Sequence, residues 1–122
     1  MDTRSKIISP EALAALTLSA PVLAVGYFDV LRPAHVAELE ALAGAGPLVV
    51  VVLPLAGELL SQHSRAELVA ALRAVDYVVV AADSDLSGLF DLLRPSRVAR
   101  LETADLHRRH ELIEEVRRRH HA

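Results

Sequence analysis

Several features that would point to particular protein classes are missing from this sequence. It has no cysteine in 122 residues, which excludes disulfides, thiolate metal sites and a cysteine nucleophile. No apolar run reaches the roughly 18 uncharged residues needed to cross a bilayer, so we expect no membrane association. Pro10 and Glu11 interrupt the apolar stretch near the start, which is not the pattern of a secretory signal. The lack of a membrane-spanning run and of a secretory signal predicts a cytoplasmic protein, whereas the lack of cysteine removes any redox argument about the compartment.

Motifs of several enzyme classes are absent as well. The sequence has no P-loop, no G-x-G-x-x-G and no Ser-His-Asp arrangement, so nothing supports hydrolase or dinucleotide chemistry. What it does contain is apolar: hydrophobic residues make up 52%, and the mean hydropathy of +0.33 is too high for a disordered chain. We expect one globular domain over residues 1–122, with a leading helix at 9–19, a core at 21–101 and a C-terminal basic helix at 103–120.

The charges are unevenly distributed. Residues 1–93 carry 5 Lys+Arg against 11 Asp+Glu, a net charge of −6, whereas residues 94–122 carry 8 against 5, a net charge of +3. The basic end is typical of a solvated helix face. The alternative is an anion- or RNA-binding module using Arg94, Arg97, Arg100 and the C-terminal arginines. Aromatic residues are not interleaved with these arginines, so we do not expect nucleic acid as a partner.

Strand and helix patterns alternate along the chain. Ser9, Pro10 and Glu11 are a typical helix start, with a capping serine, a proline at the first helical position and an acid in the first turn. Hydrophobic periodicity predicts strands at 21–28, 48–54, 76–82 and 96–101, and helices at 34–46, 64–75 (capped by Ser64), 85–93 and from 103. Parallel neighbours need crossover connections, so this order predicts an α/β fold, a doubly wound parallel sheet with helices on both faces.

In such a sheet, ligands bind beyond the carboxyl ends of the strands, at the point where the strand order reverses. The turn after the first strand, 26-GYFDVLRPAHVAEL-39, gathers Asp29, Arg32 and His35. This turn is therefore the expected ligand site. For His35 taken alone, the alternative is a partly buried histidine at the helix start, held by Asp29 or by the backbone.

Four stretches in a fixed order carry a family likeness: KIISPEALAAL, GYFDVLRPAHVAEL, SRAELVAALRAVDYVV and LFDLLRPSRVAR. The second is similar to the signature G-x-F-D-x-L-H-x-G-H-x-x-x-L, and the third to R-A-x-x-L-x-A-L-x-x-V-D-x-V-V. From Lys6 to about Arg100 the chain thus resembles the cytidylyltransferase-like nucleotidyltransferase superfamily, most closely the heptose-1-phosphate adenylyltransferase domain of bacterial ADP-heptose synthase. The resemblance implies a Rossmann-like three-layer fold of the H-x-G-H type.

The family's reaction gives these residue types a purpose. A sugar phosphate or similar acceptor attacks the α-phosphate of ATP or CTP and expels pyrophosphate, with Mg²⁺ bridging the triphosphate. Matched position by position, the resemblance assigns a catalytic role to His35 and Arg32. It assigns nucleotide binding to Gly26, Phe28, Asp29, Arg32, His35, Arg73, Asp76 and Arg100.

The sequence also departs from the family pattern. Arg32 replaces the first signature histidine, Pro33-Ala34 replaces the x-G pair, Leu53-Pro54-Leu55 replaces N-S-D, and Arg100-Leu101 replaces K-G. Each lost transition-state donor costs about 3 to 4 kcal/mol. The resemblance therefore favours a degenerate, non-catalytic domain with residual nucleotide or phosphate binding, a protein-association role and no cofactor. The alternative is an active adenylyl- or cytidylyltransferase that uses Mg²⁺.

Two further groups of side chains have both a structural and a metal-binding interpretation. Asp83 and Asp85 precede a helix, where capping is the expected role. A second group lies at helical i, i+3, i+4, i+7 spacing, which predicts a solvated face with ion pairs rather than a zinc site; its members are His107, His110, Glu111 and Glu114. We expect no metal site of the protein's own.

The apolar helices suggest a protein partner. Two of them carry more apolar side chains than one sheet face needs, which predicts a homodimer or a complex with a paralogue. These side chains are Leu68, Val69, Leu72 and Val75 in the helix at 64–75, and Leu13, Leu16 and Leu18 in the leading helix.

Overall fold

The computed structural model describes residues 2–121, with side chains through Arg119. Helices and strands alternate in the predicted order, which confirms the α/β fold class. The elements are a 3-10 helix η1 (Thr3–Lys6), α1 (Pro10–Ala15), β1 (Val22–Gly26), α2 (Pro33–Ala43), β2 (Leu48–Val52), α3 (Gln62–Ala70), β3 (Tyr77–Val80), α4 (Ser87–Leu93), β4 (Arg97–Arg100) and α5 (Glu102–His121). None of the described helices is long and apolar enough to cross a bilayer.

The four strands form one parallel sheet in the order β3-β2-β1-β4. Strand β1 pairs with β2 on one side and with β4 on the other, so that Val25 lies between Val51 and Arg100. The strand order therefore reverses between β1 and β4. A sheet of this kind binds ligands beyond the carboxyl ends of the strands at such a reversal, which here means beyond Gly26 and Arg100.

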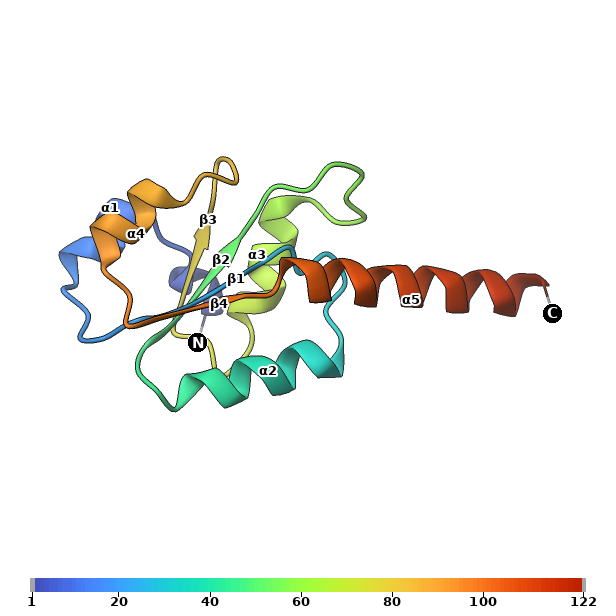
Figure 1. Ribbon diagram of the computed structural model, residues 1–122, viewed down its shortest axis with the longest axis horizontal. Coiled ribbons are helices and arrows are strands. Elements are labelled where there is room, and N and C mark those ends of the chain that lie inside the picture. The colour runs from blue at the N-terminus through green and yellow to red at the C-terminus, as the bar shows by residue number, and fades with distance from the viewer. Residues whose placement is uncertain (1, 122) are drawn as a thin grey trace.

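Helices cover the sheet on both faces (Figure 1). Helices α2 and α3 pack on one face around Val50, whereas α1 and α4 pack on the other around Val49. Every residue of β1 and of β2 is buried. This burial explains the unbroken apolar runs in the sequence, since a central parallel strand has no solvent face.

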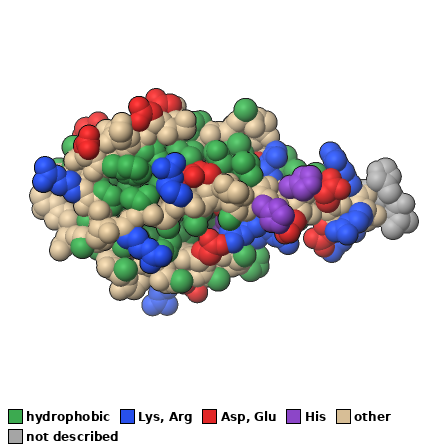
Figure 2. Space-filling view, in the orientation of Figure 1, with side chains coloured by type: hydrophobic (Ala, Val, Ile, Leu, Met, Phe, Trp, Pro, Cys, Tyr) green, Lys and Arg blue, Asp and Glu red, His purple; other side chains and the backbone are tan. Residues whose placement is uncertain are grey.

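Helix α5 differs from the other helices because it leaves the body of the protein. It begins directly after β4 at the carboxyl edge of the sheet and extends outward (Figure 1). Its 20 residues correspond to about 30 Å of helix. Figure 2 shows basic, acidic and histidine side chains gathered along the projecting part. The first turns of α5 lie against the expected ligand site.

Several helix boundaries differ from the prediction, and the largest differences are in α1 and in α3, which ends at Ala70 rather than at residue 75. Helix α1 ends at Ala15 rather than at residue 19, because Thr17 and Ala20 adopt left-handed backbone conformations with φ of 46° and 50°. Helix α3 begins at Gln62, and its cap is Ser61, whose Oγ accepts a hydrogen bond of 3.1 Å from the N–H of Ser64. The predicted cap, Ser64, thus lies inside the helix.

Part of the predicted partner surface belongs to the core instead. Leu13 of α1, Val69 of α3 and Val75, which follows α3, are buried, because these side chains pack in the core against the sheet. Leu16 and Leu68 are each 46% exposed. The homodimer or paralogue complex stays a prediction, supported by fewer side chains than the sequence offered.

Candidate functional site

The turn from β1 into α2 brings five of the predicted site residues together: Gly26, Phe28, Asp29, Arg32 and His35. Pro33 opens α2 at the first helical position, where its missing N–H costs no hydrogen bond. The N–H of Arg32 donates to Nδ1 of His35 over 2.9 Å. His35 is only 1% exposed, and this bond leaves Nε2 as the ring nitrogen that carries the proton.

A carboxylate from the far end of the chain enters this turn. Asp105, in the first turns of α5, accepts hydrogen bonds through Oδ2 from the backbone N–H groups of Tyr27 (2.8 Å) and Phe28 (3.2 Å). Its other oxygen, Oδ1, lies 2.9 Å from Nε2 of His35, but the N–H does not point along that line and no aligned donor reaches this oxygen among the described residues. Asp105 is 4% exposed, so the carboxylate is sealed inside the site.

Gly26 is what allows Asp105 to come so close. A Cβ atom at Gly26 would lie 2.3 Å from Oδ2 of Asp105 and 2.9 Å from the ring of Phe28. Both separations are shorter than any ordinary contact. Phe28 itself has φ of 52°, a conformation that costs about 1 kcal/mol or more for a non-glycine residue. The turn is thus shaped around an anionic group, and in this structure the group is the protein's own.

Asp29 is equally committed to internal partners. It accepts hydrogen bonds from the N–H groups of Leu59 and Leu60, and from Nε of Arg109 over 2.8 Å. Burial alone would raise the pKa of Asp29, but these three donors outweigh it and hold the pKa below its ordinary value. Arg109 also donates to the carbonyl of Gly57. Asp29 therefore ties the β2-α3 loop and α5 to the turn.

Arg65 is a site residue that sequence reasoning missed. It is completely buried, and its guanidinium donates to the carbonyls of Tyr27 (2.7 Å) and Leu53 (2.8 Å) at the carboxyl ends of β1 and β2. It also pairs with Glu58 at 2.6 Å. Arg65 lies one residue before buried Ala66 and four before buried Val69 in α3. This helical spacing was the signal in the sequence that could have indicated its burial. Arg65 holds the loop that covers Asp29.

Arg32 faces a cleft between the turn and α5. The cleft has a volume of about 450 Å³ and is open to solvent. Its wall on the α5 side is mainly acidic and is formed by His110, Glu111, Glu114, Glu115 and Arg118. The side chain of Arg32 therefore faces glutamate side chains of α5 rather than an open space that a phosphate could fill.

Three predicted residues lie away from this cluster. Arg73 and Asp76 stand at the amino end of the strands, where Asp76 accepts from the N–H of Leu48 over 2.8 Å. They line a surface hollow with Lys6 and are not brought to the turn. Arg100 lies at the correct edge of the sheet, at the end of β4, but it is exposed and bonded to Glu102 over 2.8 Å.

The remaining candidates have structural partners. Asp85 accepts from the N–H and the hydroxyl of Ser87, the first residue of α4, and Asp83 accepts from the N–H of Asp85. Neither is the N-cap residue, which is Leu86 without a side-chain capping bond. His107 pairs with Glu111 along the exposed face of α5, as an ion-paired helix face would. Among the described residues, no group of three or more His, Asp or Glu side chains could hold a metal ion.

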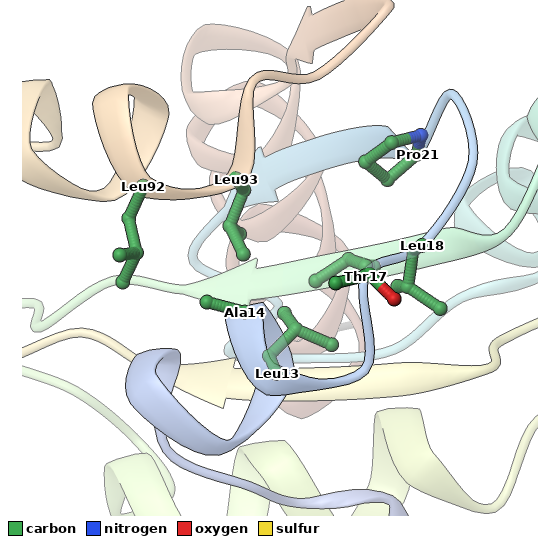
Figure 3. Close-up of a pocket in the computed structure, with 8 residues that line it drawn as sticks. Leu13, Ala14, Thr17, Leu18, Pro21, Leu92 and Leu93 are labelled. Carbon is green, nitrogen blue, oxygen red and sulfur yellow. The ribbon is translucent and has the colours of Figure 1, made fainter.

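A small apolar cavity lies elsewhere, between α1 and α4 (Figure 3). Its volume is about 160 Å³, and leucine side chains such as Leu13 and Leu93 form most of its wall. None of the predicted site residues reaches it, so it belongs to the packing of the two helices rather than to the candidate site.

Comparison with known proteins shows a likeness at the level of structure. No protein-family model and no curated protein matches the chain. Among solved structures, the chain is similar to the lipopolysaccharide core biosynthesis protein from Thermoplasma volcanium GSS1, with 26% sequence identity and a TM-score of 0.59 over 64% of this chain and 70% of that one. The likeness confirms the α/β Rossmann-like fold and relates it to that of a biosynthetic protein. The narrower assignment to the nucleotidyltransferase superfamily stays a prediction.

Proposed function

We propose that this chain is a nucleotidyltransferase-like domain that has lost catalysis and keeps a weak site for the phosphate of a nucleotide or sugar phosphate at the turn after β1. The single observation that carries the proposal is the place of Asp105. Its carboxylate takes the two backbone N–H groups at the carboxyl end of β1, in the part of the sheet where an anionic ligand would bind.

The side chains of the turn support the loss of catalysis. Transfer of a nucleotidyl group needs donors that are free to meet charge developing on phosphoryl oxygens. Here Nδ1 of His35 is already an acceptor for the N–H of Arg32, and Nε2 faces Asp105. Asp29 already accepts hydrogen bonds from the N–H groups of Leu59 and Leu60 and from Nε of Arg109. Of the charged groups in the turn, Arg32 is the one with no side-chain hydrogen bond in the described structure.

The family likeness suggests the kind of ligand, and the name of the structural relative is compatible with it. The relative takes its name from lipopolysaccharide core biosynthesis, and the sequence resemblance is to an adenylyltransferase domain that acts on heptose phosphate. We therefore propose that the ligands are ATP, CTP or a sugar phosphate. The proposed association role remains open to either a second copy of the chain or a paralogue.

Calorimetric titration with Mg-ATP and with Mg-CTP tests the binding. We expect weak saturable binding that is lost in the double variant Arg32→Ala/His35→Asn, in which asparagine keeps an acceptor near the position of Nδ1. Arg4→Ala/His63→Ala is the matched control, since it removes the same two residue types from exposed positions. Pyrophosphate release from either nucleotide with heptose 1-phosphate should not exceed that of a blank without protein. Turnover, or binding unaffected by the double variant, would contradict the proposal.

A further inference from the structure

We propose that α5 is an autoinhibitory segment, in which Asp105 occupies the anion position of the turn and is displaced when a phosphate group binds there. The inference rests on the proposed function, because it describes how that same site is regulated. It adds a second state of the protein, in which the first turns of α5 have left the turn after β1.

The attachment of α5 is narrow. Charged side chains make its contacts: Asp105 bonds to the N–H groups of Tyr27 and Phe28, Arg109 to Asp29 and to the carbonyl of Gly57, and Arg108 to Glu38. All three belong to adjacent turns at the start of the helix. The rest of α5 projects away from the body (Figure 1). A helix held at one end by polar contacts can separate without opening the hydrophobic core.

The attachment is also incomplete. Nη1 of Arg108 is buried and has no hydrogen-bond partner within the described residues, and buried Oδ1 of Asp105 has only a misaligned contact of 2.9 Å with Nε2 of His35. Buried polar atoms without partners weaken the state that contains them, because they have given up water without replacing it. A phosphate carries more charge and more acceptor oxygens than one carboxylate, so it can use the N–H groups and Nε2 of His35 more completely.

Charge at the entrance acts in the same direction. In the docked state, Glu111, Glu114 and Glu115 of α5 line the cleft opposite Arg32. These carboxylates repel an incoming phosphate. Arg118 on the same wall, and the ion pairs of Glu114 with Arg117 and of Glu115 with Arg119, offset part of the repulsion. Withdrawal of α5 removes the acidic wall together with Asp105. Phosphate binding and α5 docking are thus mutually exclusive, and each must weaken the other by the same factor.

Inorganic pyrophosphate is the probe for this competition, because it contains no base or sugar. We expect Asp105→Asn, which keeps the shape and removes the charge, to bind pyrophosphate about tenfold to a hundredfold more tightly than the unaltered protein in calorimetry, the range expected for hydrogen bonds to a charged group. Asp105→Ala should bind at least as tightly. Asp91→Asn, the same change on the exposed surface of α4, is the control and should leave the affinity unchanged. Circular dichroism verifies that each variant is folded.

Movement of the helix needs its own measurement. The absence of cysteine allows spin labels at Ser84→Cys and Val116→Cys with no background labelling. Saturating pyrophosphate should lengthen the mean distance between the two labels or broaden its distribution. Without ligand, Asp105→Asn should change the distance in the same direction but by less. A distance that does not respond would overturn the displacement of α5.

The outcomes separate this inference from the proposed function. Equal pyrophosphate affinity in the unaltered protein and in Asp105→Asn would overturn autoinhibition and leave the phosphate site standing. No binding by any variant, including Asp105→Ala, would overturn both, because it would show that the turn accepts no anion except its own carboxylate.

Discussion

The close approach of Gly26 and Asp105 leads to a sharp prediction about stability. In Gly26→Ala the new methyl group would lie 2.3 Å from Oδ2 of Asp105 and 2.9 Å from the ring of Phe28, so the carboxylate must retreat. It would lose its hydrogen bonds to the N–H groups of Tyr27 and Phe28. Hydrogen bonds to a charged partner contribute about 1.5 to 3 kcal/mol each. We expect the variant to lose about 4 kcal/mol of unfolding free energy.

A double-mutant cycle isolates the cause. Asp105→Ala alone should cost about 3 kcal/mol, because it leaves two backbone donors without a partner. In the double variant Gly26→Ala/Asp105→Ala the methyl group meets no carboxylate, and only the contact with the Phe28 ring remains. The double variant should therefore be about as stable as Gly26→Ala alone, which corresponds to a coupling of about 2 to 3 kcal/mol.

Urea denaturation followed by circular dichroism measures these free energies, since the chain has no tryptophan for fluorescence. Gly88→Ala is the control: nothing lies within 4 Å of its added methyl group, and we expect a gain of about 0.5 to 1 kcal/mol within helix α4. Additive losses in the double variant, within about 0.5 kcal/mol, would refute the contact between Gly26 and Asp105.

Two further predictions concern the groups that hold the site together. Arg65→Met should cost about 3 to 5 kcal/mol, because it strips the carbonyls of Tyr27 and Leu53 of a buried charged donor; exposed Arg119→Met is the control, and a loss below 1 kcal/mol for Arg65→Met would contradict the role. The pKa of Asp29 is held below its ordinary value of 3.8 in the folded protein, so its contribution to stability is present above that pH and is lost as the pH falls through the lowered value. Urea midpoints should therefore fall between about pH 5 and pH 2, and less steeply in Asp29→Asn; identical slopes would exclude Asp29 as the cause.

The fold could be predicted because its signals are local. The valine runs at β2 and β3 read directly as parallel strands, and Ser9-Pro10 marked the start of α1. The errors came from choices that the sequence leaves open. Ser61 and Ser64 are both good caps, and only the packing of α3 selects Ser61. Thr17 and Ala20 adopt the left-handed conformation without being glycine, so no residue type announced the end of α1.

Only the part of the candidate site that lies in one continuous stretch of the chain could be predicted from the sequence. Gly26, Phe28, Asp29, Arg32 and His35 lie together because they share a single turn. Their partners come from elsewhere: Tyr27 meets Asp105 from 78 residues further along, and Asp29 meets Arg109 from 80.

The sequence offered no pairing rule for such distant contacts. In the sequence, both partners read as members of a charged, solvated helix. Of the two partners predicted for His35, the backbone is present, since the N–H of Arg32 donates to Nδ1, whereas the carboxylate beside Nε2 is that of Asp105 and not that of Asp29.

The position of Asp105 depends on the number of residues between the end of β4 and Asp105. Strand β4 ends at Arg100, and the residues at 101–104 set where on α5 the carboxylate falls. An α-helix turns by about 100° for each residue and advances 1.5 Å. One residue inserted into this segment would carry Asp105, Arg108 and Arg109 around to another side of the helix, although every side chain of the site would still be present. The length of this segment therefore decides whether Asp105 reaches the turn after β1. Among relatives, the same length would show whether a carboxylate of α5 can occupy that turn.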